Sequence, residues 1–256
     1  MSSSINADLT AHVSALARRY DLSDESTPQL LSVLELLRSD PFAPTSVTDP
    51  LRAVNDHLAD SLVALELQPV RTASSIADLG AGAGLPGLPL AIALPRARVW
   101  LVESSARKCE FIQRAVEACG VANAVVVHSR AESWRAGLRR FDVVTARALA
   151  PLAVVEEYAA PLLRIGGLLV VWRGQRDPDA EGSAYRAAVE LGLELNEPKQ
   201  VHPYKGAKHR HLHLASKVSE TPPSFPRREG LARKRPLGDR GAPAISDGRG
   251  SDRVQR

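Results

Sequence analysis

The spacing of apolar residues divides the chain into a helical beginning and an alternating middle. Over the first 68 residues, apolar positions recur every three or four residues, which is the repeat of an α-helix with one buried face. The first series is Ile5, Leu9, Val13, Leu16 and Tyr20, and the last is Leu51, Val54, Leu58, Leu62 and Leu65. Thr27-Pro28 and Asp49-Pro50 are typical helix starts, because a capping side chain precedes a proline in the first turn. The pattern predicts an N-terminal helical extension over residues 1–68.

From residue 69 to residue 219, short apolar runs alternate with amphipathic stretches. The runs lie at 75–79, 98–103, 124–128, 141–147 and 168–172, and helical spacing returns between them. A further alternating run at 209–218 suits a strand near the edge of a sheet. Apolar strands that alternate with helices indicate a mostly parallel sheet covered by helices on both faces. We therefore predict a doubly wound α/β domain over residues 69–219.

The composition changes at residue 220, where proline, glycine and arginine become frequent and apolar periodicity ends. Residues 220–256 hold nine Lys or Arg against five Asp or Glu, which accounts for the whole net charge of +4. The rest of the chain is neutral overall, so a pI of about 9.3 is weak support for nucleic-acid binding by the folded part. We predict a disordered basic tail over 220–256, either simply solvated or adding nonspecific affinity for RNA.

The two cysteines and the absence of long apolar runs bear on the compartment. Cys109 and Cys119 are ten residues apart on a predicted helix, roughly 15 Å along its axis, which is too far for a disulfide. Free thiols fit a reducing compartment. The N-terminus lacks the pattern of a secretory leader, and no apolar run approaches the ~18 residues of a membrane span. We expect a cytoplasmic protein with no membrane partner.

The stretch 78–91, DLGAGAGLPGLPLA, carries two overlapping glycine signatures. It follows a predicted strand and precedes a predicted helix, an arrangement that brings the backbone close to a nucleotide or an anion. Counted from Gly80, it has the G-x-G-x-G order that begins many enzymes using S-adenosylmethionine (SAM). Counted from Gly82 to Gly87, it has the G-x-G-x-x-G order of dinucleotide-binding proteins. Glu103 ends the next predicted strand and suits the ribose hydroxyls of either ligand.

Three features favour SAM over a dinucleotide. Asp78 ends the first predicted strand, and a carboxylate there attracts the amino group and the sulfonium of SAM. Pro86 and Pro89 remove backbone donors that a pyrophosphate would use. Glu132 follows the third predicted strand, where an acid suits an adenine amino group. A dinucleotide enzyme and a purely structural glycine turn remain the alternatives at this point.

Several stretches together resemble one family over roughly residues 5–217. They are TSVTDPLRAVNDHLADSL, DLGAGAGLPGLPLAI, LVESSARKCEFI, SRAESW, FDVVTARALAPL, LLRIGGLLVVWRGQ and RHLHLASK. The chain resembles the glucose-inhibited division protein B family, and the G-L-P-G-L-P run is the most specific part of the resemblance. The resemblance implies a Rossmann-like class I SAM-dependent methyltransferase that methylates N7 of a guanine in 16S ribosomal RNA, by resemblance guanine 527 of the 530 loop. A SAM enzyme acting on a small molecule or on another RNA is the alternative.

The resemblance also implies roles for individual residues. Asp78 would face the amino-acid part of SAM, Glu103 would bind the ribose, and Arg147 would lie beside the methyl-transfer site as the catalytic residue. The other implied SAM contacts are Gly80 and Leu85 on the methionine side, Gly82 and Gly84 as shapers of the loop, and Ala131 and Glu132 at the adenine. Methyl transfer to N7 removes no proton from the base, so the reaction needs no obligatory general base. We also expect no metal ion.

The RNA side of the expected site is less completely matched. RNA phosphates attract arginine and lysine, and our candidates for contact with RNA are Arg173, Arg176, Lys205 and Arg210. The chain has Ala43-Pro44-Thr45 where the family usually has Asn-Leu-Thr, and Arg173-Gly174-Gln175 where it usually has Lys-Gly-Gln. We expect 16S ribosomal RNA or a precursor of the small ribosomal subunit as partner, and a monomeric enzyme. His209, His211 and His213 share one face of the last predicted strand without a completing ligand, so we expect no metal there.

Overall fold

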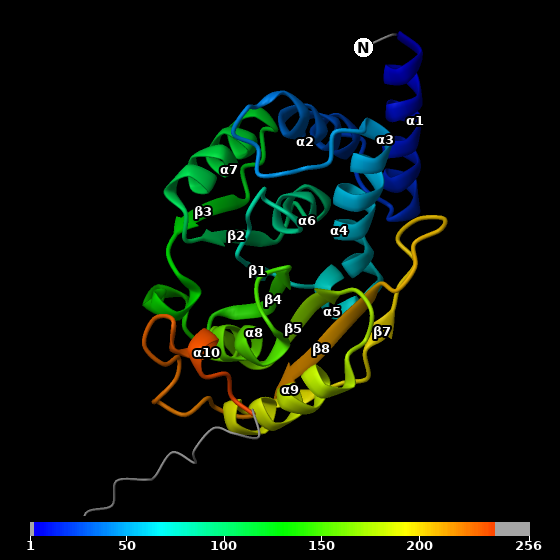
Figure 1. The fold of residues 1–256 in the computed structure, drawn as a ribbon. Coiled ribbons are helices and arrows are strands. Elements are labelled where there is room, and N and C mark those ends of the chain that lie inside the picture. Colours follow the sequence, from blue (N-terminus) through cyan, green and yellow to red (C-terminus); the bar gives the residue numbers. More distant parts are fainter. Residues whose placement is uncertain (1–2, 239–256) are drawn as a thin grey trace, which may run out of the picture.

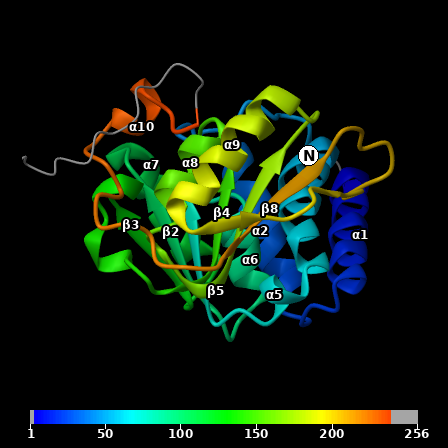
Figure 2. The same cartoon turned by 90° about the horizontal axis from the view of Figure 1, so that it is seen from below.

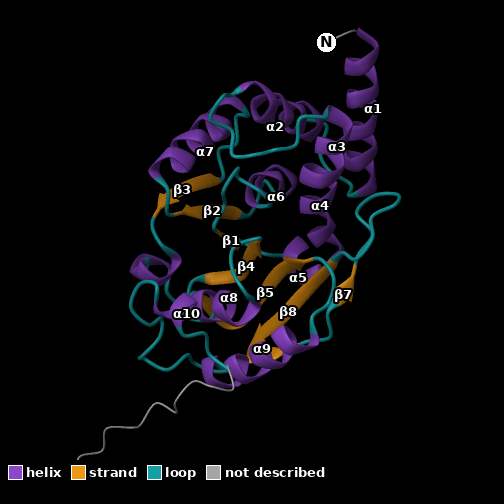
Figure 3. Cartoon of the chain, viewed as in Figure 1, coloured by secondary structure: helices purple, strands orange, loops and turns teal. Residues whose placement is uncertain are grey.

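The fold is an eight-stranded sheet between two layers of helices (Figures 1 and 3), seen in a computed structural model that describes residues 3–238. The strands are β1 Ser75–Leu79, β2 Arg98–Glu103, β3 Ala124–His128, β4 Phe141–Arg147, β5 Leu163–Arg173, β6 Leu193–Leu195, β7 Lys199–Gln200 and β8 His211–Lys217. The helices are α1 Ser3–Arg19, α2 Ser26–Ser39, α3 Pro50–Ala53, α4 Asp60–Leu62, α5 Gln68–Arg71, α6 Gly87–Ala93, α7 Ala106–Ala118, α8 Leu152–Ala159, α9 Pro178–Leu191 and α10 Leu231–Lys234. All six predicted strands are present in the observed sheet.

The order of the strands explains where a ligand can bind. Along the main path the order is β3-β2-β1-β4-β5-β8-β6, and β7 pairs with β8. Strands β1 to β5 are parallel, whereas β8 runs antiparallel to β5. The chain moves outward from β1 to β3 and then returns to lay β4 on the other side of β1. This reversal leaves a crevice at the carboxyl ends of β1 and β4, the usual ligand site of doubly wound sheets.

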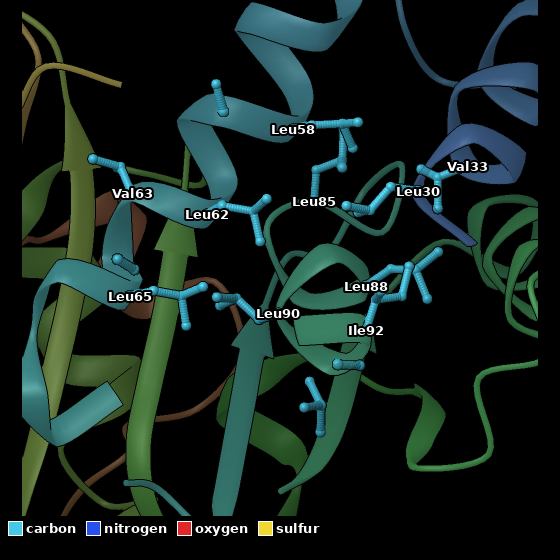
Figure 4. Packing of buried hydrophobic residues seen from close by; sticks show 14 of the residues in the cluster. Leu30, Val33, Leu58, Leu62, Val63, Leu65, Leu85, Leu88, Leu90 and Ile92 are labelled. Atoms are coloured by element: carbon cyan, nitrogen blue, oxygen red, sulfur yellow. The ribbon is translucent and has the colours of Figure 1, made fainter. Parts of the chain in front are cut away.

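The helical extension packs directly on one face of the sheet. Its buried residues and those of α6, α7 and the sheet form one apolar cluster. Figure 4 shows Leu58 and Leu62 facing Leu85 and Leu90 across this contact. Helices α8, α9 and α10 cover the opposite face (Figure 2) and belong to a second cluster. The extension is therefore bound to the sheet by burial of apolar surface, the main favourable term in folding.

The third expected helix has an irregular centre. Asp49 caps it as predicted, since its Oδ1 accepts a hydrogen bond from Arg52 N at 2.6 Å. After α3 the helix widens into a π-helical segment over Val54–Ala59 before α4. Such segments are rare and frequently lie at functional sites, because the extra residue redirects the side chains that follow. Here it places Asp56 and Asp60 at the crevice beside β4, as described below.

The prediction of a disordered tail is wrong for residues 220–238. Phe225, Ala232 and Leu237 are buried, and Arg227 forms an ion pair with buried Glu157 at 2.5 Å. The segment packs without regular periodicity because prolines interrupt it, so helical or strand spacing gives no sign of its burial. The part of the prediction that concerns 239–256 falls outside the described residues. Across residues 3–238 no helix has both the length and the apolar character needed to cross a membrane.

Candidate active site

The glycine loop turns sharply at the end of β1. Gly80, Gly82 and Gly84 all have positive φ, a conformation that L side chains rarely adopt. Gly80 N and Ala81 N both donate to the carbonyl of Val102 in β2, at 2.8 and 3.1 Å. A Cβ on Gly80 would also lie 2.6 Å from the Leu149 side chain. The glycines are therefore required by the backbone itself, and they leave the loop open to close approach by a ligand.

Asp78 joins this loop to the neighbouring strand. Its Oδ1 accepts a hydrogen bond from Thr145 Oγ1 in β4 at 2.8 Å, and its Oδ2 accepts one from Gly87 N at 2.9 Å. The side chain is 1% exposed, and burial raises the pKa of the carboxyl to about 6. Gly87 allows this contact, because a Cβ there would lie 2.2 Å from Leu101 Cδ2 and 2.8 Å from Asp78 Cβ. Asp78 thus fixes the start of α6 and keeps a negative charge beneath the loop at neutral pH.

Glu103 lies beside Asp78 at the end of β2. Its Oε1 accepts hydrogen bonds from Ser104 N and Ser105 N at 2.8 and 2.9 Å, and its Oε2 accepts one from Gly82 N at 3.1 Å. Three backbone donors therefore orient a carboxylate that is only 6% exposed. The hydrogen bond from Gly82 ties Glu103 to the glycine loop, and the expected contact of Glu103 with the ribose stays a prediction.

Ala131 and Glu132 form a short 3-10 turn after β3 that faces the same loop. Glu132 is 8% exposed, and its Oε1 accepts a hydrogen bond from Gly230 N at 3.3 Å. A cavity of about 60 Å³ separates Gly80 from this turn, with Leu149 and Arg233 on its other walls. The structure thus brings together residues that lie far apart in the chain. We call Asp78, Glu103, Glu132 and the loop Gly80–Gly84 the acidic cradle.

The acidic cradle has the chemistry that SAM requires. Its glycines permit close backbone approach, its carboxylates suit a cation and ribose hydroxyls, and its cavity lies at the crevice of the sheet. Leu85 differs from expectation, because its side chain is 6% exposed and packs in the apolar core near Leu58 (Figure 4). Any contact of Leu85 with SAM would therefore come from its backbone.

Arg147 lies at the end of β4, on the other side of the crevice. Its Nη1 donates to Asp60 Oδ2 at 2.9 Å and to the carbonyl of Asp56 at 3.2 Å. The positive charge of Arg147 is near enough to favour the ionised form of Asp78, which partly opposes the rise in the pKa of that carboxyl caused by burial. Arg147 therefore stands between the acidic cradle and the helical extension.

A larger cleft begins at Arg147. It has a volume of about 380 Å³, and we call it the arginine cleft after Arg147, Arg173 and Arg210, which line it with Asp60 and Trp172. Arg210 Nε lies 3.5 Å from Asp60 Oδ1, and Arg173 Nη1 donates to the carbonyl of Ala150. Trp172 Nε1 donates to the carbonyl of Asp60 at 2.7 Å. Asp60 therefore holds two arginines at once.

Asp56 is a second anchor that the sequence did not single out. Tyr204 Oη donates to Asp56 Oδ1 at 2.8 Å, and Arg210 Nη2 donates to Tyr204 Oη at 3.3 Å. Asp56 and Asp60 are four residues apart, so the spacing alone placed them on one helix face. The target of that face, the end of β4 about 90 residues later, was not visible in the pattern.

Two expected RNA contacts lie elsewhere. Arg176 is bound by Glu181 at 2.7 Å and by Glu197 at 3.1 Å, and it does not line the arginine cleft. Lys205 is exposed in the loop between β7 and β8, also outside the cleft lining. His213 is buried, 3.8 Å from Glu181. Within residues 3–238 no group of three or more metal-binding side chains occurs, and the expectation of a metal-free enzyme stays a prediction.

The segment Ala43-Pro44-Thr45, which departs from the usual family sequence, makes a polar contact with His57 through Thr45. Thr45 Oγ1 and His57 Nε2 share a hydrogen bond of 2.9 Å, which ties the segment before α3 to the π-helical segment. Burial lowers the pKa of His57, and the charge of Arg147 lowers it further. A neutral imidazole beside Arg147 fits a positioning role for this segment.

Fold and site define a Rossmann-like class I SAM-dependent methyltransferase. Solved structures of this class share the fold. A SAM-dependent methyltransferase from Aquifex aeolicus matches with a TM-score of 0.53 and 17% identity, over 66% of this chain and 94% of that chain. Fibrillarin from Aeropyrum pernix, solved with natively bound SAM, matches with a TM-score of 0.50 and 22% identity, over 61% and 72%.

The chain belongs to the rRNA small subunit methyltransferase G (GidB) family, whose model matches residues 39–212. Relatives with that name include one from Rubrobacter xylanophilus, 40% identical over 74% of this chain and 75% of its own. Another, from Chloroflexus aggregans, is 38% identical over 84% of this chain and 92% of its own. A third, from Desulfitobacterium hafniense, is 37% identical over 75% and 81%.

Proposed function

We propose that the protein transfers the methyl group of SAM to N7 of a guanine in 16S ribosomal RNA. One observation carries the proposal: Asp78 of the acidic cradle is hydrogen-bonded to β4, and Arg147 at the end of β4 lines the arginine cleft and is close enough to act on the charge of Asp78, so a methyl donor and a base could be held side by side. Membership of the family supports 16S RNA as the substrate class. The resemblance supports guanine 527 as the particular position. The proposal places the enzyme in the cytoplasm, with the RNA or a small-subunit precursor as partner.

The acidic cradle would hold SAM by charge and by its backbone. SAM supplies an electrophilic methyl group when bound. Beneath the loop, Asp78 places a negative charge near the cationic donor, while the amides of Gly82, Ser104 and Ser105 keep Glu103 oriented toward ribose hydroxyls. Because these groups are fixed before the ligand arrives, binding requires little rearrangement. Glu132 and Ala131 would contact the adenine.

The arginine cleft would hold the RNA. N7 of guanine has a lone pair and no proton to lose, so catalysis rests on orientation and needs no general base. Asp60 and the carbonyl of Asp56 fix Arg147 at the boundary with the cradle, where it can position the target guanine. Arg173 and Arg210 are placed to contact phosphates on the far side of the cleft.

Transfer of labelled methyl to RNA from a strain that lacks this protein tests the proposal. The expected result is one labelled guanine per 16S RNA, at the position given above, and no labelling of RNA from the parent strain. Naked 16S RNA and assembled small subunits serve as separate substrates. Binding of SAM with no labelling of either substrate would contradict the proposed substrate. Failure to bind SAM would contradict the proposed function as a whole.

A further inference from the structure

The C-terminal strap, which we define as residues 220–238, packs beside the predicted adenine end of the acidic cradle. It lies beyond the residues that the family model matches. In Figure 1 its helix α10, drawn in orange-red, lies beside α8 and near the turn after β3. The roles given so far to the cradle and the cleft include none for this segment, although it packs at the predicted adenine end of the cradle.

Both ends of the strap are anchored. Near its start, Phe225 is 6% exposed, and Arg227 pairs with Glu157, which is 1% exposed. Near its end, Leu237 is 6% exposed, and the carbonyl of Gly238 accepts a hydrogen bond from Arg186 at 2.6 Å. A buried carboxylate requires its cationic partner, so the ion pair at Glu157 fixes the strap strongly.

The middle of the strap contacts the cradle itself. Glu229 accepts a hydrogen bond from Ser133 Oγ at 2.5 Å and lies 3.3 Å from Arg130. Its neighbour Gly230 donates its N–H to Glu132 Oε1. The strap therefore clasps both sides of the turn that holds Ala131 and Glu132.

Arg233 completes the connection to the opposite wall. Its Nη2 donates to the carbonyl of Leu149 at 2.9 Å, and its side chain lines the same cavity as Gly80 and Glu132. The loop containing Leu149 follows β4, whereas Glu132 follows β3. Thus the strap contacts two loops that line opposite sides of the same cavity.

We propose that the strap is the outer wall of the SAM pocket and slows release of SAM from its adenine end. This inference rests on the proposed function. Gly230 fixes Glu132, and Arg233 closes the space between Glu132 and Leu149. A ligand held behind this wall must wait for the contacts of Arg233 to break before it leaves. Tight binding by the cradle and slow release through the strap are then separate properties of the chain.

Single substitutions in α10 test the strap without removing its anchors. Arg233→Ala removes the contact with Leu149, and Lys234→Ala removes the same charge from an exposed neighbour in the same helix. We expect Arg233→Ala to speed dissociation of S-adenosylhomocysteine about tenfold, the usual range for loss of one charged hydrogen bond. The Kd of SAM should change less, because the lost bond joins two parts of the wall and does not contact the ligand. Lys234→Ala should change both by less than twofold. Stopped-flow release and calorimetry measure the two quantities, and the melting temperature confirms folding.

The outcomes with the full-length variants separate the strap proposal from the proposed function. An unchanged or slower dissociation of S-adenosylhomocysteine from Arg233→Ala would overturn the proposal, since loss of the wall must speed release. If the unaltered chain itself does not bind SAM, the proposed function fails. If the unaltered chain binds SAM and Arg233→Ala releases S-adenosylhomocysteine at the same rate as the unaltered chain, only the strap proposal fails.

Discussion

The two halves of the crevice carry opposite charges and are held in different ways. In the acidic cradle, the carboxylates of Asp78, Glu103 and Glu132 are all less than a tenth exposed, and backbone amides donate to each of them. In the arginine cleft, Arg147 and Arg210 are held by carboxylates from the helical extension. The first half is built from the turns that end the strands, and the second depends on a separate part of the chain.

This difference gives the helical extension a direct place in the site. The ion pair of Arg147 with Asp60 joins residues 87 positions apart, and the widened π-helical segment sets the position of that aspartate. The cradle would survive small movements of the extension, because its donors lie on the sheet edge. The cleft would not. Changes to the two halves should therefore separate cofactor binding from methyl transfer.

Replacement of Arg147 by alanine should have the largest effect. The side chain lines the arginine cleft and is close enough to act on the charge of Asp78, so its loss removes the group expected to position the guanine. We expect the rate of methyl transfer to fall by about a hundredfold or more, a typical result of lost orientation. The Kd of SAM should rise by less than about tenfold, since the carboxylates of the cradle remain. Single-turnover assays and calorimetry measure the two values.

Arg18→Ala is the matched control, because Arg18 is an exposed arginine on α1 far from both halves in the chain. Its rate and its melting temperature should equal those of the unaltered enzyme. A normal rate in Arg147→Ala, with SAM binding intact, would contradict the role assigned to this arginine.

Gly87→Ala should damage the cradle through packing. The added Cβ would lie 2.2 Å from Leu101 and 2.8 Å from Asp78, so α6 must move away from the sheet. Overpacking of this kind lowers the free energy of unfolding by about 1–3 kcal/mol. It also displaces the backbone N–H of residue 87, which donates a hydrogen bond to Asp78. Gly182→Ala in α9 is the control, because its Cβ would meet only Arg186 Nη1 at 3.7 Å. Denaturant unfolding should show loss of stability for the first and a small gain for the second.

Asp78→Asn should separate the charge of the cradle from its hydrogen bonds. Because burial raises the pKa of Asp78 from 3.8 to about 6, the folded state binds more protons than the unfolded state between these values. Stability due to this group is therefore complete below pH 3.8 and declines as the pH rises to about 6, by roughly 3 kcal/mol. Asparagine should remove this decline and make the protein more stable above pH 6.

The same change should weaken SAM binding by about tenfold at pH 7.5, because a full negative charge is lost near the cation. Asp8→Asn, on the exposed face of α1, should alter neither the pH dependence nor the Kd. Unfolding curves from pH 4 to pH 7.5 measure the pH dependence of stability, and calorimetry at pH 7.5 measures the Kd of SAM. Unchanged SAM binding in Asp78→Asn would show that Asp78 serves the loop alone.

The short stretches that make up the cradle could be recognised in the sequence, because each of them ends or follows a predicted strand. The glycines follow β1, Glu103 ends β2 and Glu132 follows β3, so each lies at the same edge of a parallel sheet. In the structure Gly80 and Glu132 line one cavity, and Glu103 accepts a hydrogen bond from Gly82. The pairing of Asp78 with Thr145 could not be foreseen, since the register of parallel strands depends on distant packing. The position of Asp60 depends on a π-helical segment, which leaves no mark in a helical apolar repeat.

The start of α2 and the strap show the same limit. Thr27-Pro28 was expected to begin α2, but the helix begins at Ser26 with Glu25 before it. The strap was expected to be disordered because its composition resembles that of unfolded chains, yet three buried apolar residues and one buried ion pair are enough to fix it. Composition indicates the average tendency of a segment to be disordered, whereas its packing in the fold depends on a few particular side chains.

Glu156 in α8 is a buried carboxylate without hydrogen-bond donors in the described part of the chain, and it can be compared with the cradle carboxylates, which have them. We expect its replacement to have the smallest effect of those considered. It is fully buried beneath a cavity of about 230 Å³ between α8, α9 and the sheet, and its two oxygens have no hydrogen-bond partner among the described residues. Burial raises its pKa well above the usual value. Its contribution to stability therefore falls as the pH rises above about 4.5, as for Asp78, but with no donor to oppose the change.

Glu156→Leu should accordingly raise the unfolding free energy at pH 7.5 by about 1–3 kcal/mol, since an unsatisfied buried polar group is removed. Glu190→Gln removes one exposed negative charge from α9 and should change stability by less than about 0.5 kcal/mol. Methyl transfer should be unchanged in both, because neither residue lines the cradle or the cleft. A loss of stability in Glu156→Leu would mean that this carboxylate is satisfied by bound water in solution, and the contrast with the backbone-bonded acids of the cradle would then disappear.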